Sequence, residues 1–245
     1  MTVPVKPDYT SLDLPPPPPD RPYVLINMVM SADGKVVIEG TEQGIGSKTD
    51  QRLMRELRVN ADVVLNGAGT LRASGTSSRL GDPALEALRE ERGKPRFPTA
   101  AVLSRSGRLP LDRAFFTARD FDAVVYLSTA TPEERRQAVA ATGRRVEVLP
   151  AGEEVPAMLA HLRRELDARV LLVEGGPTLN AELFELGLVD EYFLTLGPVV
   201  VAGSETLTAV EGPRAFTRET ARRLELLSAV PNPATNEVYL RYRVR

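Results

Sequence analysis

The sequence predicts an α/β protein with a mostly parallel central sheet flanked by helices and with antiparallel strands at its C-terminal end. Apolar runs of strand length alternate with segments of helical periodicity over residues 23–186. Two of these runs end directly in glycine-rich turns. Residues 191–244 contain strands without strong helical segments between them, and the last strand alternates polar and apolar residues. The simplest organisation is one domain over residues 21–245.

The N-terminal half begins with a strand over residues 23–30, whose apolar run is consistent with burial on both faces. A turn with Asp33 and Gly34 ends it. Ser47 or Thr49 can cap a helix over residues 47–59, in which Leu53 and Leu57 have helical spacing. The other elements predicted in this half are strands over residues 61–66, 99–103 and 123–127 and a helix over residues 83–92.

The C-terminal half continues the alternation before it becomes rich in strands. Pro132 suits the first turn of a helix over residues 132–141. Leu159, Leu162 and Leu166 lie on one face of the helix predicted over residues 153–167. Thr178 is expected to cap a helix over residues 179–186. The predicted strands are residues 146–149, 169–174, 191–196, 224–230 and 237–244.

Composition excludes several classes of site. The 245 residues have a net charge of −2 and contain no cysteine, so disulfides, thiolate metal sites and a cysteine nucleophile are excluded. His161, the one histidine, rules out multi-histidine metal sites, and its mid-helix position favours a surface or packing role. No apolar run has the length of a membrane span, and no signal peptide is visible. We expect a soluble cytoplasmic protein without metal, nucleic-acid or membrane partners.

Residues 1–20 are predicted to form an N-terminal arm. Residues 15–19 are all proline, which favours an extended polyproline II conformation. We expect this stiff segment to lie on the surface of the chain or on a partner subunit, with a recognition sequence for another protein as the alternative.

Two glycine-rich turns carry the functional prediction. Residues 66–70 (N-G-A-G-T) and 174–180 (E-G-G-P-T-L-N) each follow a strand, where ligands collect in open α/β sheets. Glycines allow the backbone to approach a phosphate, and the Thr70 hydroxyl can donate to one. The second turn leads into a helix start suited to a pyrophosphate. Each turn alone could be a tight strand-to-helix connection, but two in one domain favour a nucleotide.

Neither turn has the G-x-G-x-x-G pattern of dinucleotide-binding βαβ units, because Gly67 and Gly69 lack a third glycine. The strand at residues 99–103 is followed by Ser104 and Arg105. A hydroxyl and a guanidinium there suit a 2′-phosphate, and therefore NADPH more than NADH. A solvated turn is the alternative interpretation of this pair.

The chain resembles the pyrimidine reductases of riboflavin biosynthesis. The segments M-S-A-D-G-K (residues 30–35), L-R with D-V-V-L-N-G-A-G-T (57–70) and V-E-G-G-P-T-L (173–179) are similar to motifs of that family in order and spacing. The resemblance covers residues 21–244. It implies a dihydrofolate-reductase-like fold, NADPH as hydride donor and a homodimer. Many bacterial members carry an additional zinc deaminase domain, for which this chain lacks the cysteines.

The family's roles transfer to matching positions of this sequence. Arg58 would meet the substrate phosphate, with a surface helix residue as the alternative. Glu174 would meet the pyrimidine or ribosyl part of the substrate. Asp33 would either bind a substrate hydroxyl or cap its turn. The cofactor contacts would be Val29, Gly67, Gly69, Thr70, Ser74, Ser104, Arg105, Gly175, Gly176, Pro177, Thr178 and Leu179.

Two segments depart from the family pattern and concern the substrate pocket. Residues 71–79 lack the two aspartates and the L-T-V-R element that usually follow G-T, and Arg79 is the candidate replacement for the lost arginine. Residues 44–47 (G-I-G-S) lack the usual aromatic residue. A reductase of the same fold with another substrate, such as a pterin, and a non-catalytic NADP-binding protein are therefore the alternatives.

The implied reaction is hydride transfer from the nicotinamide to C1′ of a ribosylamino-pyrimidine phosphate, which converts a ribosyl group into a ribityl group. The cofactor supplies the hydride, and the protein supplies alignment and a dry site. Protonation of a ring-opened imine would make it a better acceptor. Glu174, Asp33 and water are the candidate proton donors.

Overall fold

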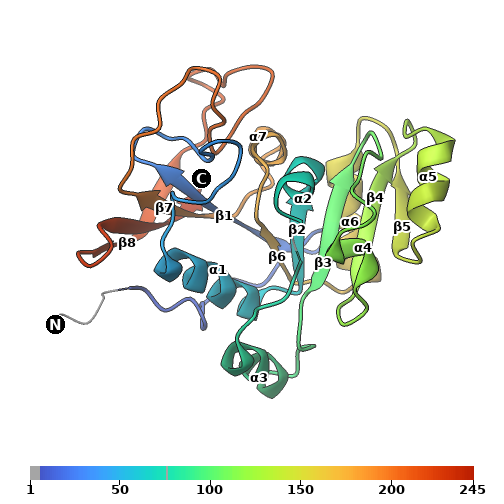
Figure 1. Cartoon of the computed structure of the whole chain (residues 1–245), viewed down its shortest axis with the longest axis horizontal. Coiled ribbons are helices and arrows are strands. Elements are labelled where there is room, and N and C mark those ends of the chain that lie inside the picture. Colours follow the sequence, from blue (N-terminus) through green and yellow to red (C-terminus); the bar gives the residue numbers. More distant parts are fainter. Residues whose placement is uncertain (1–5, 76) are drawn as a thin grey trace.

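The computed structural model describes residues 6–75 and 77–245. These residues form a nine-stranded sheet with the order β5-β4-β3-β2-β6-β1-β7-β9-β8 (Figure 1). The strands are β1 (Tyr23–Ser31), β2 (Val63–Gly67), β3 (Thr99–Ser104), β4 (Ala123–Ser128), β5 (Arg145–Leu149), β6 (Val170–Val173), β7 (Glu191–Gly197), β8 (Leu224–Asn232) and β9 (Glu237–Val244). The helices are α1 (Lys48–Asn60), α2 (Ala68–Ser74), α3 (Pro83–Glu91), α4 (Ala114–Thr117), α5 (Glu133–Ala140), α6 (Glu154–Glu165) and α7 (Pro177–Glu185).

The sheet has one parallel and one antiparallel part. Every neighbouring pair from β5 to β7 is parallel. Strand β9 pairs antiparallel with both β7 and β8. Strands β7, β9 and β8 form the end of the sheet opposite β5. The predicted mostly parallel sheet with antiparallel C-terminal strands is confirmed. Because β3, β2, β6 and β1 are adjacent and parallel, their carboxyl ends meet at one edge.

Alternation along the strands divides the core between the two faces of the sheet. Val24 and Ile26 of β1 pack in the cluster that contains the buried residues of α6 and α7. Tyr23 and Leu25 point to the opposite face, where they pack with Leu57 of α1. Helices α2, α4 and α5 contribute to the cluster that covers β3 and β4 on that opposite face. Burial on both faces explains the continuous apolar runs of the parallel strands.

The structure corrects three details of the predicted helices. Residues 68–70, predicted as a turn, begin the short helix α2, and α4 was not predicted. Helix α2 contains a glycine and is held by Leu71, which is fully buried in the core, so tertiary packing outweighs its weak intrinsic propensity. Thr178 does not cap α7: it lies in the first turn, and the cap residue is Gly176.

The described part of the N-terminal arm packs against α1 of the same chain. Tyr9 is buried, and its ring contacts Phe193 edge-on with a centroid separation of 5.1 Å. The Asn60 side chain donates a hydrogen bond of 2.7 Å to the Tyr9 carbonyl oxygen. The arm therefore contributes to the core that covers one face of the sheet.

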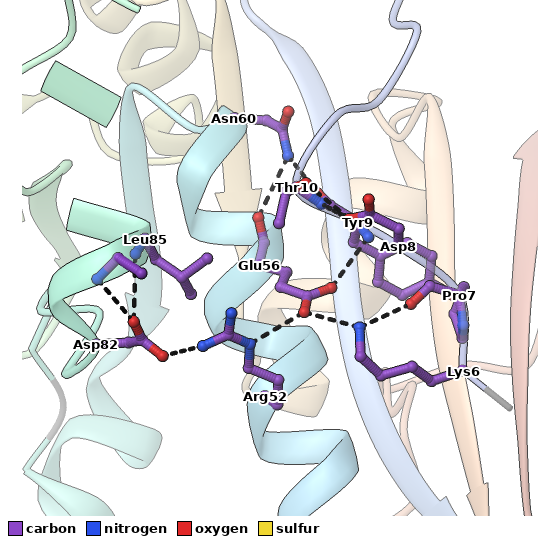
Figure 2. Close-up of polar contacts among 11 residues, drawn as sticks. Lys6, Pro7, Asp8, Tyr9, Thr10, Arg52, Glu56, Asn60, Asp82 and Leu85 are labelled. Atoms are coloured by element: carbon purple, nitrogen blue, oxygen red, sulfur yellow. Dashed lines mark hydrogen bonds and ion pairs between the residues drawn. The ribbon is translucent and has the colours of Figure 1, made fainter. Parts of the chain in front are cut away.

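Glu56 of α1 is the polar anchor of this arm. Its side chain, 3% exposed, accepts hydrogen bonds from the Lys6 ammonium group at 2.8 Å, the Tyr9 backbone N–H at 3.1 Å and Arg52 Nε at 3.0 Å. Arg52 also pairs with Asp82, the N-cap of α3 (Figure 2). One buried carboxylate thus joins the arm to α1, and Arg52 extends this network to α3.

Replacing Glu56 with glutamine is expected to loosen the arm. The amide keeps one acceptor but loses the charge that Lys6 and Arg52 share, which should lower the free energy of unfolding by about 2 kcal/mol. Chymotrypsin should then cleave faster after Tyr9, as measured by mass spectrometry. Glu134→Gln, at an exposed position of α5, is the control. Equal cleavage rates in both variants would contradict the anchoring role of Glu56.

Candidate functional site

A cavity of about 940 Å³ opens at the shared carboxyl edge of β1, β2, β3 and β6. The ends of these four strands, the glycine turns that follow β2 and β6, and one face of α1 line it. This size and position are typical of a small-molecule or cofactor site in an open α/β sheet.

The two glycine turns lie against each other on one side of the cavity. The Gly67 N–H donates a hydrogen bond of 2.8 Å to the Gly175 carbonyl oxygen. A Cβ atom at Gly67 would lie 3.0 Å from the Gly176 backbone nitrogen, and one at Gly176 would lie 3.1 Å from the Thr70 hydroxyl. Gly175 has a φ of +86°, a conformation that favours glycine. Side chains at Gly67 or Gly176 would therefore push the two turns apart.

Helix α7 presents its first turn to the cavity. Its cap residue, Gly176, has no side chain to bond the free N–H groups at the start of the helix. Pro177, Thr178 and Leu179 line the cavity at this point. These N–H groups and the positive end of the helix dipole form a site that suits an anion.

One face of α1 forms another wall of the cavity. Ser47 caps this helix, and its hydroxyl oxygen accepts hydrogen bonds from the Thr49 and Asp50 backbone N–H groups. The lining residues of the helix recur at helical spacing, which places their side chains along one stripe. They are Asp50, Gln51, Met54, Arg55 and Arg58.

Arg58 and Glu174 join the two walls. Arg58 Nε and Nη2 donate hydrogen bonds of 2.7 Å each to the two carboxylate oxygens of Glu174. Arg58 Nη1 also donates to the Arg79 carbonyl oxygen at 2.5 Å. Both paired side chains are only 8% exposed, so this two-point ion pair is held away from bulk water. The surface position considered for Arg58 does not match this geometry.

Most residues predicted for the site line this one cavity. The structure brings together Val29, Arg58, Gly67, Gly69, Thr70, Ser74, Ser104, Arg105, Glu174, Gly175, Gly176, Pro177, Thr178 and Leu179. Their functional roles stay predictions, because their placement shows proximity and not contact with a ligand.

Ser104 and Arg105 reach the cavity but already have partners within the chain. The Ser104 hydroxyl oxygen accepts a hydrogen bond of 3.1 Å from the Gly107 N–H. Arg105 forms ion pairs with Glu182 at 2.5 Å and with Glu154 at 3.1 Å. Burial acts to lower the pKa of Arg105, but its hydrogen bonds to these carboxylates outweigh burial and raise it. The charge of Arg105 is therefore largely compensated.

Two predicted site residues do not line the cavity. The Asp33 carboxylate accepts hydrogen bonds from the Ser31 hydroxyl at 2.6 Å and from the Val201 and Ala202 N–H groups, and these bonds lower its pKa to about 2. These contacts match the alternative in which Asp33 stabilises its turn. Arg79 forms a two-point ion pair with Asp120 at 2.7 Å. Its guanidinium is thereby held outside the cavity, so neither side chain is placed to meet a substrate there.

Among the lining residues that were not predicted from the sequence, Asp50, Asn66 and Arg55 have polar groups that bear on the chemistry of the cavity. Asp50 is a buried carboxylate, and Asn66 Oδ1 is buried without a hydrogen-bond partner among the described residues. Arg55 lies one turn before Arg58 and makes no hydrogen bond or ion pair with another described residue. Two signals in the sequence were available. Asn66 is a polar residue at the end of an apolar strand, and Arg55 and Arg58 have the i, i+3 spacing that places them on one side of a helix.

Metal-binding clusters and membrane-spanning helices are both absent from residues 6–75 and 77–245. This part of the chain has no cluster of three or more His, Cys, Asp or Glu side chains able to hold a metal ion. None of its helices combines the length and apolar character that spanning a membrane requires.

Comparison with solved structures identifies the fold. A pyrimidine reductase-like protein from Corynebacterium diphtheriae superposes with a TM-score of 0.81 at 23% identity, covering 92% of this chain and 93% of that protein. RibD from Acinetobacter baumannii superposes with a TM-score of 0.72 at 20% identity, covering 92% of this chain and 58% of that protein.

Sequence comparison identifies the family. Residues 22–231 match the RibD C-terminal domain. A 2,5-diamino-6-ribosylamino-4(3H)-pyrimidinone 5′-phosphate reductase from Archaeoglobus fulgidus is 33% identical over 200 residues, covering 78% of this chain and 87% of that protein. The protein of the same name from Methanothermobacter thermautotrophicus is 31% identical over 210 residues, covering 84% of this chain and 91% of that protein. The resemblance found in the motifs is confirmed, and the chain belongs to the RibD C-terminal domain family.

Proposed function

We propose that this chain is an NADPH-dependent reductase that converts the ribosyl group of a ribosylamino-pyrimidine phosphate into a ribityl group. The observation that carries the proposal is the pairing, in one cavity, of a glycine-lined anion site with a wall that holds the Arg58–Glu174 ion pair. Relatives that are about a third identical over the aligned residues are named as reductases of such a phosphate.

The glycine side of the cavity fits a phosphorylated dinucleotide. Gly67, Thr70 and the start of α7 would hold the pyrophosphate, because their backbone groups can approach closely and the free N–H groups face the cavity. The unpaired Asn66 Oδ1 offers an acceptor for an amide or amino group of a ligand. When bound there, NADPH supplies a hydride.

The α1 side of the cavity fits the substrate. Glu174 can accept hydrogen bonds from hydroxyl or amino groups, and Arg58 fixes the orientation of its carboxylate. Arg55 is the α1 cation that both lines the cavity and lacks an anionic partner among the described residues, and a guanidinium matches phosphate oxygens. We therefore assign the substrate phosphate to Arg55, in place of Arg58.

Turnover assays with purified protein test this proposal. The protein is incubated with NADPH or NADH and with the diamino-ribosylamino-pyrimidinone phosphate, its deaminated uracil analogue or a pterin, and loss of the reduced nicotinamide is followed by absorbance. We expect turnover with NADPH and one of the two pyrimidines. Turnover with the pterin alone would favour a different substrate. The departure of residues 71–79 from the family pattern is the reason for testing this alternative. Cofactor binding without turnover would favour the non-catalytic alternative.

We also propose a preference for NADPH over NADH. Arg105 is neutralised by Glu154 and Glu182, so it offers less attraction to a 2′-phosphate than the sequence alone suggests. The homodimer implied by the family also stays a prediction, which light scattering of the purified chain would test.

Replacing Arg55 with alanine is expected to raise the KM for the phosphorylated substrate about 10- to 100-fold, because a charge-assisted hydrogen bond contributes about 1.5–3 kcal/mol. Turnover at saturation should change little, since Arg55 would contact the phosphate and not the reacting carbon. Arg164→Ala, at an exposed position of α6, is the control. An unchanged KM in Arg55→Ala would exclude this arginine as the phosphate anchor.

A further inference from the structure

Four carboxylates line the cavity, and one of them stands apart. Glu174 is paired with Arg58, and Glu182 is paired with Arg105. Glu42 is exposed to solvent. Asp50 is buried, with 9% of its surface exposed, and forms no ion pair with any described residue. Asp50 is therefore the lining carboxylate that is buried from solvent and has no cationic partner among the described residues.

Tertiary packing from several elements buries Asp50. It lies in the first turn of α1, and a Cβ atom at Gly46 would come within 3.1 Å of both Asp50 and Val29 of β1. Burial raises the pKa of Asp50 to about 6; the Thr195 hydroxyl on β7 opposes this rise, and the charge of Glu237 on β9 adds to it. Burial raises the pKa of Tyr9 in the N-terminal arm, and the charge of Asp50 adds to that rise.

Glu237 favours its ionised form, and its negative charge favours the protonated form of Asp50. Burial would raise the pKa of Glu237, but hydrogen bonds from Ser47, Tyr239 and Thr235 lower it below its usual value. A neighbouring negative charge disfavours a second one. Two adjacent acids with opposite pKa shifts are the arrangement by which enzymes separate a permanent anion from a proton donor.

We infer that Asp50 is the acid that protonates the substrate nitrogen during the proposed reduction. The inference rests on the proposed function and assigns the proton donor within the same site. Glu174 is less suited to this role, because both of its carboxylate oxygens already accept hydrogen bonds from Arg58. Asp33 lies outside the cavity.

The step balances with one proton from the protein. In the ring-opened substrate, C1′ and the amino nitrogen share a C=N bond. The Asp50 carboxyl group gives its proton to that nitrogen while C1′ receives the hydride, so the CH=N double bond becomes a CH2–NH single bond. The imine gains two electrons, and NADPH becomes NADP⁺. The Asp50 carboxylate then recovers a proton from solvent through the open cavity.

The spacing of residues on α1 is consistent with this role. Asp50 and Arg55 are five residues apart, which corresponds to about 7.5 Å along the helix axis. Both side chains line the same cavity, so a substrate whose phosphate meets Arg55 would share that cavity with Asp50.

Kinetics of Asp50→Asn test the inference. We expect turnover at pH 7 to fall about 100-fold, the loss typical for removal of a general acid. NADPH affinity, measured by fluorescence titration, should change less than about twofold. In the unmodified protein kcat/KM should fall as pH rises above about 6, because the acid form disappears, and the variant should lack this decline. Asp112→Asn, at an exposed loop position, is the control.

Thermal unfolding without ligands gives an independent readout. Because the folded pKa of Asp50 is raised, the protonated group stabilises the fold at low pH, and this stability is lost as pH rises through about 6. Asp50→Asn should therefore melt several degrees above the unmodified protein at about pH 8, and the difference should vanish near pH 4. An identical midpoint at every pH would show that Asp50 is not a buried, protonated group.

A second variant covers the case in which Asp50→Asn does not fold. Glu237→Gln removes the neighbouring charge but keeps the donor, so the decline of kcat/KM should move to lower pH. Normal turnover and an unaltered pH profile in Asp50→Asn would overturn the inference alone. Absence of turnover by the unmodified protein with either pyrimidine would overturn the proposed function and, with it, this role of Asp50.

Discussion

Glu174→Gln is expected to reduce turnover about 100-fold while NADPH affinity changes little. The amide can accept only one of the two hydrogen bonds from Arg58, and its NH₂ group would face a guanidinium N–H. Breaking a pair that is 8% exposed should cost about 3 kcal/mol, which corresponds to roughly 100-fold in rate if the loss falls on the transition state. Single-turnover kinetics and a separate NADPH titration measure the two effects.

The substrate-side role of Glu174 depends on the difference between these two losses. Equal reductions of turnover and NADPH affinity would indicate that Glu174 supports the cofactor turn instead. Arg58→Lys should behave similarly to Glu174→Gln, because lysine keeps the charge but lacks the planar two-point geometry. Glu165→Gln, at an exposed position of α6, controls for the change of charge.

Gly197→Ala is expected to be the most destabilising substitution among the glycines that have no positive φ. A Cβ atom at this position, at the end of β7, would clash with the Ile45 backbone carbonyl group. Backbone cannot move aside as a flexible side chain can, so the loss of stability should reach about 3 kcal/mol. For a chain of this length that corresponds to a fall of roughly 10 °C in the unfolding midpoint, which circular dichroism would measure.

The same substitution should also affect the site, because Ile45 is followed by Gly46 and Ser47, which lead into α1. A displaced helix start would move the wall that carries Asp50 and Arg55. Gly69→Ala is the matched control for stability: its Cβ would have no neighbour closer than 3.8 Å, and alanine favours the helix. A Gly197→Ala protein as stable as Gly69→Ala would refute the predicted clash.

The sequence alone predicted the elements whose signals are local. Continuous apolar runs over residues 23–30 and 61–66 correspond to β1 and β2, because both faces of a parallel sheet are buried. The helix predicted over residues 47–59 corresponds to α1. Its cap and its apolar spacing depend only on residues that are close together in the sequence. Helix α2 was missed because its stability comes from the burial of Leu71 beneath distant strands.

The candidate site divides in the same way. Its glycine turns were visible because each is a short segment that follows its own strand, and parallel strands end at the same edge. The compensation of Arg105 was not visible, since Glu154 and Glu182 reach it from two helices, α6 and α7, that are remote in the sequence. Arg79 was predicted to face the substrate, but the fold gives it Asp120 as a partner.

The sequence by itself determined the nine strands and five of the seven helices, the two glycine turns and the family to which the chain belongs. Only the tertiary structure decided which charges meet: Arg58 and Glu174 are separated by 116 positions, and Asp50 is shielded by residues of β7 and β9. Secondary-structure and turn signals depend on neighbours along the chain. Ion pairs and pKa values depend on desolvation and on distances between remote segments, which exist only once the sheet has assembled.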